Sequence, residues 1–301
     1  MSDGLHNCYA KLNLCLHVGP RRKDGFHELG SVVVPIPWAD ELSVDVKKGC
    51  GRVSLELGKS HIKVPNDESN LAFKAAVEFL KLVGSDYDIH IKLTKKVPIG
   101  AGLAGGSADG GHVLRILNDL TGKPLDTASL IKLASQLGSD CPFFIDPKPV
   151  WMSGRGEKLV PLTDLGCILP PLYLVVAIPD ISLSTAEIFR LFDQRSNNHS
   201  LLTQRGTCAI HPCLLARGDS FEAPVFYNDL AEVVFEISLQ SRVLRDALLD
   251  AGAYAASVTG AGSAVFGVFD TPELADAAAT RIGSADPGVI TEVFWTAGSS
   301  S

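Results

Sequence analysis

A glycine-rich segment at residues 98–109 (PIGAGLAGGSAD) constrains the fold more than any other feature of the sequence. Glycines take positive φ angles and let successive backbone N–H groups surround one anion, because no Cβ stands in the way. The segment follows an alternating run at 87–93, which predicts a strand, and precedes a predicted helix at 107–120. The positive end of that helix points at the same place. The segment therefore predicts a phosphate-binding loop between a strand and a helix.

Two other nucleotide-binding motifs were compared with this loop. No Gly-Lys-Ser/Thr follows the glycines, which excludes a Walker A loop. Gly100, Gly102 and Gly105 do satisfy GxGxxG, but a Rossmann strand is continuously apolar, whereas the strand before this loop alternates with lysines. Residues 95–98 also separate the predicted strand from the first glycine of the loop, which argues against a Rossmann turn. The strand thus predicts a sheet with one exposed face, and a glycine-rich connection without a ligand stays an alternative.

The order of predicted elements indicates an α+β fold with two domains, 1–160 and 161–301. In the second domain, apart from one short helix at 184–191, the order is β-α-β-β-α-β, the split βαβ arrangement of ferredoxin-like domains. Residues 193–224 are then an insertion. The predicted strands are 7–17, 42–47, 52–57, 87–93, 172–178, 254–258, 264–269 and 289–295, and the other predicted helices are 70–83, 126–138, 228–251 and 272–282.

Composition argues against several classes of protein. The net charge of −7 gives no basic field for nucleic acid. Polar residues interrupt the first twenty positions, so no signal peptide is predicted and we expect a cytoplasmic protein. The longest apolar stretch, 167–179, is too short for a bilayer, and no obligate protein partner is predicted. Seven scattered cysteines indicate reduced thiols, and Cys208, His211 and Cys213 are read as packed side chains in preference to a partial zinc site.

Four blocks of sequence carry a resemblance to a known family. They are 10–14 (AKLNL) with 24–28 (DGFHE), the glycine-rich loop, 137–142 (LGSDCP) and 258–263 (VTGAGS). With these blocks the chain resembles the GHMP kinases over nearly its whole length. The first block points to the branch that phosphorylates the 2-hydroxyl of 4-diphosphocytidyl-2-C-methyl-D-erythritol in non-mevalonate isoprenoid synthesis. The resemblance implies a mixed α/β nucleotide-binding domain followed by a ferredoxin-like domain, with ATP and Mg2+ as cofactors.

The resemblance also implies catalytic roles for two residues. Asp140 matches the general base and Lys11 its partner. An alcohol is a poor nucleophile, so a carboxylate must accept its proton as the phosphoryl group arrives. A lysine beside that carboxylate keeps it ionised and screens charge on the phosphoryl oxygens. Read without the family, Lys11 is an exposed strand residue and Asp140 a turn residue.

Binding residues are implied in the same way. Phe26 stands where the family usually has a tyrosine that stacks on cytosine, His27 matches the reader of the base, Asn13 matches a contact to the polyol, and Phe189 matches the second aromatic of the sandwich. Read without the family, both phenylalanines are core residues. The metal ligands are unknown. The ATP loop comprises Pro98, Ile99, Gly100, Ala101, Gly102, Leu103, Ala104, Gly105, Gly106 and Ser107, and the third motif comprises Gly260, Ala261, Gly262 and Ser263.

Some expectations stay open at this point. Asp109 is expected to interact with the N-terminus of the helix after the loop. Gly110 and Gly111 are expected to loosen the start of that helix. The acceptor could instead be homoserine or a mevalonate-type alcohol, or the chain could be a non-catalytic nucleotide-binding or dinucleotide-dependent protein.

Overall fold

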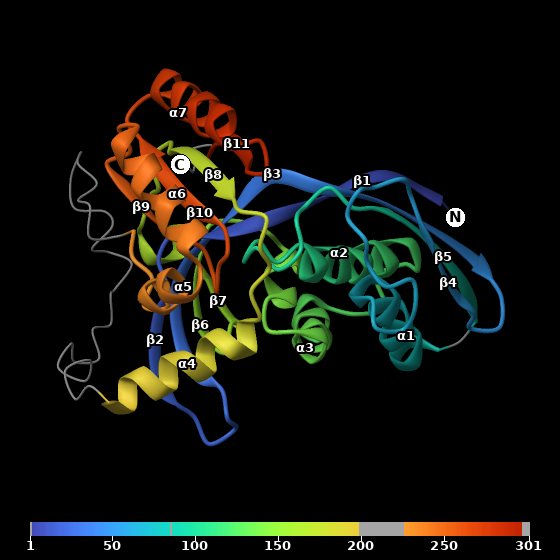
Figure 1. Ribbon diagram of the computed structural model, residues 1–301. Coiled ribbons are helices and arrows are strands. Elements are labelled where there is room, and N and C mark those ends of the chain that lie inside the picture. The colour runs from blue at the N-terminus through green and yellow to red at the C-terminus, as the bar shows by residue number, and fades with distance from the viewer. Residues whose placement is uncertain (1, 85, 199–225, 297–301) are drawn as a thin grey trace. The chain divides into compact units, whose positions relative to one another are not determined.

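The computed structural model describes residues 2–84, 86–198 and 226–296, which form two compact units (Figure 1). Both units are discontinuous in sequence, because the long strand β3 (His27–Lys48) contributes to each of them. The predicted boundary at residue 160 stays a prediction. Unit 1 consists of Met1–Lys11, Pro37–Ile99 and Ala104–Lys148, and unit 2 of Leu12–Ile36, Gly100–Leu103 and Pro149–Ser301, within the described residues.

Unit 1 places helices beside a mixed sheet. Strand β5 pairs antiparallel with β3 and parallel with β4, so the sheet is mixed. Ile89, Ile91 and Leu93 of β5 are buried while intervening residues are partly or fully exposed, which confirms a strand with one open face. The elements are β1 (Ser2–Asn13), β4 (Val53–Leu57), α1 (Leu71–Val83), β5 (Tyr87–Thr94), α2 (Gly105–Leu120), α3 (Thr127–Leu137) and the 3-10 helix η1 (Cys141–Ile145).

Local capping explains the ends of α1 and α3. The side chain of Asn70 accepts a hydrogen bond from the backbone N–H of Ala72, and that of Asp126 accepts one from Ser129 at 2.8 Å. Gly84, with φ of 105°, ends α1. The predicted helices at 70–83 and 126–138 are therefore confirmed to within about a residue, and α2 begins two residues earlier than predicted.

Two glycines of α2 permit close packing. A Cβ on Gly111 would lie 2.6 Å from Cβ of Phe144 and 2.9 Å from the carbonyl oxygen of Cys141. A Cβ on Gly110 would lie 3.2 Å from the carbonyl oxygen of Leu71. These glycines bring α2 against η1 and α1. The helix α2 is continuous through both positions, and the expected loosening at its start stays a prediction.

The C-terminal part of unit 2 is an antiparallel sheet in the order β11-β8-β10-β9. This order confirms the predicted split βαβ arrangement. The predicted helix at 228–251 is two helices, because Ser238 leaves the helical conformation and its hydroxyl caps the second helix at Ser241 N–H. The elements are β8 (Tyr173–Ile178), α5 (Ala231–Ile237), α6 (Leu239–Asp250), β9 (Ala255–Val258), β10 (Val265–Phe269), α7 (Pro272–Ala285) and β11 (Ile290–Trp295).

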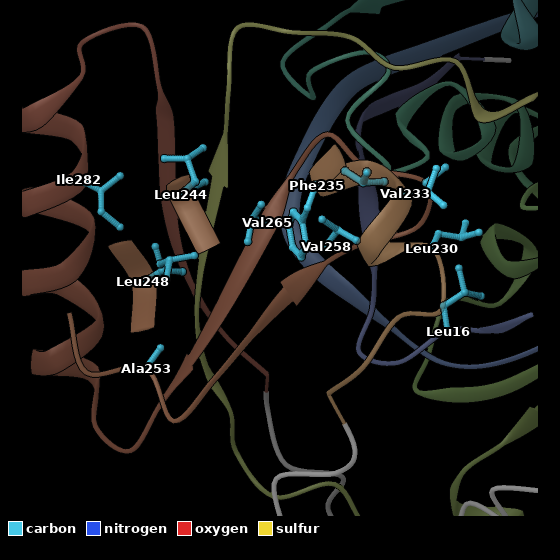
Figure 2. Packing of buried hydrophobic residues seen from close by; sticks show 14 of the residues in the cluster. Leu16, Leu230, Val233, Phe235, Leu244, Leu248, Ala253, Val258, Val265 and Ile282 are labelled. Atoms are coloured by element: carbon cyan, nitrogen blue, oxygen red, sulfur yellow. The ribbon is translucent and has the colours of Figure 1, made fainter. Parts of the chain in front are cut away.

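A buried apolar cluster holds these helices against the sheet. Figure 2 shows Val233 and Phe235 of α5, Leu248 of α6 and Ile282 of α7 gathered with strand residues such as Val265. Each of these side chains is at most 5% exposed. Burial of such apolar surface is the main favourable term for the unit, at about 25 cal/mol per Å².

The rest of unit 2 contains α4, which the helix predicted at 184–191 covers in part, and other elements that the sequence did not predict. Strand β3 pairs with β2 and β6, and β6 pairs with β7. Residues 193–198, predicted as part of an insertion, belong to a helix, while 199–224, with Cys208, His211 and Cys213, lie outside the described residues. The elements are β2 (His17–Arg21), β6 (Val150–Gly154), β7 (Lys158–Pro161), the 3-10 helix η2 (Thr163–Leu165) and α4 (Thr185–Asn198). Within the described ranges, no helix is both long and apolar enough to cross a membrane.

Candidate active site

Lys11 and Asp140 come together in unit 1. Lys11 lies near the end of β1 and is 3% exposed, and Asp140 immediately precedes η1. The Lys11 Nζ lies 3.8 Å from Oδ2 of Asp140, whose side chain is 36% exposed. Burial lowers the pKa of Lys11, and Asp140 opposes that shift. The structure therefore joins a buried ammonium to an accessible carboxylate, and the reading of Lys11 as an exposed strand residue is wrong.

The start of α2 lies next to η1. Ser107, in the first turn of α2, hydrogen-bonds the thiol of Cys141, the residue after Asp140. Burial is the larger influence on that thiol and raises the pKa of Cys141 to about 12, so it stays protonated. Gly138 lies beside both residues, since a Cβ there would be 3.4 Å from Sγ of Cys141 and 4.0 Å from Oγ of Ser107, which is ordinary contact. The end of the glycine-rich loop and Asp140 are thus neighbours within unit 1.

The glycine-rich loop has the backbone that the sequence predicted. Gly100 and Gly102 have φ of 68° and 81°, and Ala104 also has a positive φ, 57°. A Cβ on Gly102 would lie 2.2 Å from the carbonyl oxygen of Thr259. Ala104 precedes α2 without a side-chain cap, whereas Asn70 and Asp126 cap α1 and α3. The residue before α2 therefore supplies no side-chain acceptor for the first N–H groups of the helix, an arrangement that can accept an anion.

The third motif adjoins the segment Gly100–Leu103 in unit 2. The backbone N–H of Ala264 donates to the carbonyl of Ala101 at 3.2 Å, and the Ser263 hydroxyl donates to the carbonyl of Ile181 at 2.6 Å. Gly260 and Gly262 both have positive φ angles, of 56° and 75°. Gly260, Ala261, Gly262 and Ser263 thus form a tight turn that supports this part of the loop.

Asn228 also holds the third motif, and sequence reasoning missed it. Its side-chain amide donates to the carbonyls of Val258 and Gly260 at 3.0 and 2.8 Å. Its side-chain oxygen accepts a hydrogen bond from the N–H of Leu230, just before α5. An asparagine at the start of the helix predicted at 228–251 is the capping signal that would have drawn attention to it.

Asn13 is held by two further residues that sequence reasoning missed. Its backbone N–H donates to the hydroxyl of Thr259 at 2.9 Å, and its side-chain amide donates to the hydroxyl of Ser31 at 2.7 Å. Ser31 in turn donates to the carbonyl of Cys15 at 2.5 Å. Ser31 and Thr259 are fully buried, so this network fixes the orientation of the Asn13 amide.

His27 and Phe189 also come together, in unit 2. Their rings stack with centroids 5.5 Å apart and planes 26° from parallel. The Nδ1 of His27 lies 2.9 Å from the carbonyl oxygen of Gly19, and its Nε2 lies 3.0 Å from Oδ1 of Asp193. Both ring nitrogens therefore contact the protein itself. Asp193 was missed because the predicted helix stopped too early; on α4 it lies one turn beyond Phe189.

Phe26 has different surroundings. Its ring is 48% exposed and lies under the guanidinium of Arg155, 4.7 Å from the centroid. The reading of Phe26 as an ordinary core residue is therefore wrong, and Arg155 is a neighbour that the sequence did not indicate.

Asp109 does not interact with the helix terminus in the way that was expected. Its side chain is 3% exposed and its Oδ2 lies 2.7 Å from Nζ of Lys95, which also contacts Asp40. Burial raises the pKa of Asp109 to about 8, with Lys95 lowering it and Asp40 raising it further. The carboxyl is therefore part of a buried cluster of three ionisable side chains.

Comparisons with known proteins agree with this geometry. The family model for the GHMP kinases N-terminal domain matches residues 70–146, and that for the GHMP kinases C-terminal domain matches 214–287. A 4-diphosphocytidyl-2-C-methyl-D-erythritol kinase of Chloroherpeton thalassium is 36% identical over 90% of this chain and 91% of its own. One from Chlorobium phaeobacteroides is 35% identical over 96% of both chains.

Solved structures give the same result. A crystal structure of 4-(cytidine 5'-diphospho)-2C-methyl-D-erythritol kinase superposes with a TM-score of 0.74, at 31% identity, over 98% of this chain and 100% of that one. The mevalonate kinase of L. major, at 14% identity and a TM-score of 0.73 over 99% and 97% of the two chains, shares the fold. From the matching family models, the close relatives and the shared fold, it follows that this chain belongs to the GHMP kinases, a family of phosphotransferases.

Proposed function

We propose that the chain transfers the γ-phosphoryl group of ATP to the 2-hydroxyl of 4-diphosphocytidyl-2-C-methyl-D-erythritol, a step of non-mevalonate isoprenoid synthesis. Relatives that carry the name of this kinase match about nine tenths of the chain at 32 to 37% identity. The structural observation that carries the proposal is the contact between Lys11 and Asp140, because it supplies a base and a cation at one point.

Asp140 accepts the proton of the acceptor hydroxyl. Its side chain is accessible enough to meet a substrate, while Lys11 behind it is buried. The Lys11 Nζ lies 3.8 Å from Oδ2 of Asp140, close enough to form an ion pair with a carboxylate, the form that a general base requires. Lys11 also stabilises the negative charge that develops on the phosphoryl group during transfer. A buried cation stabilises such charge more strongly than a cation in water does.

The glycine-rich loop and the first turn of α2 hold the ATP phosphates. This role follows from the positive φ angles of Gly100 and Gly102 and from the uncapped start of α2. In the described ranges no group of three or more His, Cys, Asp or Glu side chains forms a metal cage. Mg2+ commonly binds through substrate phosphates and one or two protein oxygens, so it would enter with the nucleotide and neutralise phosphate charge.

The cytidine end of the acceptor is bound by aromatic residues of unit 2. Phe26 offers an exposed ring, and Phe189 lies at a fixed place against His27. Asp193 and the Gly19 carbonyl hold the His27 ring at both nitrogens. The fixed ring supports Phe189, which stacks on the cytosine base. Asn13, whose amide is fixed by buried hydroxyls, contacts the polyol; these assignments follow the motif positions of the family.

An ADP-release assay with Mg-ATP tests the acceptor. The wild-type protein is offered the cytidyl substrate, homoserine and mevalonate in parallel, with ATP binding measured separately by calorimetry. The proposal predicts turnover with the cytidyl substrate and none with the other two. Saturable ATP binding without turnover of the cytidyl substrate would contradict the acceptor assignment and leave the family membership intact.

A further inference from the structure

Three buried charged residues of unit 1 have no part in the mechanism above. Asp40 on β3, Lys95 just after β5 and Asp109 on α2 have side chains that are 0%, 2% and 3% exposed. They come from three separate segments of the chain and meet at Nζ of Lys95. Removing charges from water is costly, and apolar residues of similar size usually serve stability as well or better. The cluster therefore calls for a role besides filling the core.

Asp40 contacts both ends of the glycine-rich loop. Its Oδ1 accepts hydrogen bonds from the backbone N–H groups of Lys96 and Val97, at 2.5 and 2.9 Å, just before the loop begins. Near the other end of the loop, α2 starts at Gly105, where a Cβ would lie 3.4 Å from Oδ2 of Asp40 and 2.9 Å from Cγ1 of Val97. One carboxylate thus lies against the residues on either side of the loop.

Lys95 adds a second connection across the loop. Its Nζ pairs with Oδ2 of Asp40 and with Oδ2 of Asp109, the latter at 2.7 Å. Asp109 lies on α2, two residues beyond Ser107. Among the residues that the structure describes, the other oxygen of Asp109, Oδ1, is buried without a hydrogen-bond partner. The strand end before the loop and the start of the helix after it are therefore tied together through hydrogen bonds from the Lys95 ammonium.

We propose that Asp40, Lys95 and Asp109 form a buried clamp that fixes the two ends of the glycine-rich loop and so positions it for the phosphates of a nucleotide. The proposal rests on the proposed function for the identity of that nucleotide, ATP. All three are positioning residues, because they act through the backbone and the helix start. A glycine-rich loop is flexible, and fixing its ends lowers the entropy lost when phosphates bind.

The structure supplies matched controls for a test. Glu41 and Lys96 follow Asp40 and Lys95 in sequence and form the same kind of pair, at 2.5 Å, but on the surface. Glu41→Gln therefore removes a neighbouring ion pair without touching the clamp. Ile89→Val shortens a buried side chain of β5 at a position away from the loop. This variant therefore reports the effect of lower stability alone.

The experiment measures MgATP affinity by calorimetry, and KM and kcat, for wild type, Asp40→Asn and the two controls. The Asp40→Asn amide would turn its N–H groups toward the Lys95 ammonium or toward the two backbone donors, so one side of the clamp opens. We expect Asp40→Asn to weaken MgATP binding about tenfold or more, with the KM of the acceptor little changed. Both controls should stay within about twofold of wild type. Equal weakening in Asp40→Asn and Ile89→Val would overturn the proposal.

Hydrogen–deuterium exchange of the wild type decides the matter if Asp40→Asn does not fold. The clamp predicts that the amides of Lys96, Val97 and the first turn of α2 exchange as slowly as those of central β5 before any nucleotide is added. Fast exchange that slows only with MgATP would contradict a preformed clamp. Absence of MgATP binding to the wild type would contradict the proposed function, and the exchange measurement would still decide whether the clamp exists.

Discussion

Replacing Asp109 by asparagine should remove a pH dependence from the stability of the protein. Aspartate ordinarily has a pKa of 3.8, whereas burial raises the pKa of Asp109 to about 8 in the folded chain. Between those values the folded protein binds one more proton than the unfolded chain. Stability from this group is therefore complete below about pH 4 and is lost as pH rises through about 8. Asparagine resembles the protonated carboxyl and cannot lose that proton.

The size of the effect follows from linkage. One extra proton in the folded state corresponds to a slope of about 1.4 kcal/mol per pH unit, and the slope fades near the folded pKa. Between pH 6 and pH 8 wild type should lose about 2 kcal/mol that Asp109→Asn keeps. The side chains that face Asp109 are those of Lys95 and Asp40. Burial raises the pKa of nearby Cys8 well above its usual value, so its thiol does not titrate between pH 6 and pH 8.

Urea unfolding at several pH values from 6 to 8 measures the difference. Other titrating groups, including the histidines, are shared by both proteins and cancel when the two are subtracted. Any constant cost of placing an amide at the unpartnered Oδ1 position also shifts the curve without tilting it. Parallel stability curves for wild type and Asp109→Asn over this range would refute the reasoning.

Three further predictions concern other parts of the site. Asp193→Ala should raise the KM for the cytidyl substrate about three- to tenfold and leave the KM for ATP within about twofold, in steady-state kinetics, because it releases the His27 ring. Gly111→Ala should lower unfolding stability by about 1–3 kcal/mol because its Cβ would strike η1, whereas Gly106→Ala, with 3.9 Å of clearance, should be neutral or raise stability by up to about 1 kcal/mol. The lowered pKa of Lys11 predicts that kcat falls at a pH below 10.5, and a pH–rate profile that stays flat up to that pH would contradict it.

Local signals in the sequence predicted the elements well where they were strong. The helices predicted at 70–83 and 126–138 match α1 and α3 to within about a residue, and the alternation of β5 identified a strand with an open face. The glycine-rich loop predicted its own positive φ angles. These features depend on neighbours in sequence, so they are visible without the fold.

Other features depend on contacts between distant segments and were missed. Strands β6 and β7 are five and four residues long, and β6 gains its pairing from β3. The break at Ser238 depends on a serine that caps a helix within a continuous apolar pattern. Gly111 reads as a weak point in a helix until η1 is placed against it. Asp40 has no motif, and its meaning comes entirely from partners brought together by folding.

The site residues likewise include some that the sequence predicted and some that it did not. Lys11 and Asp140 were expected to act together, and the structure brings them within 3.8 Å. Their roles, and those of the residues assigned to the acceptor, stay predictions that the experiments above address. The residues that hold those side chains, such as Ser31, Thr259 and Asp193, were not indicated by the sequence, because a supporting hydrogen bond leaves no periodic pattern.

The most direct test of the account is phosphorus NMR of the reaction mixture with Mg-ATP and the cytidyl substrate, for wild type, Asp140→Asn and Asp146→Asn. Asp146 ends the same short helix, is exposed and pairs with Lys148, so it matches Asp140 in chemistry but not in place. We expect a new phosphomonoester signal with wild type and Asp146→Asn, and none with Asp140→Asn, although Asp140→Asn still binds ATP. Undiminished phosphoryl transfer by Asp140→Asn would contradict the assignment of the base.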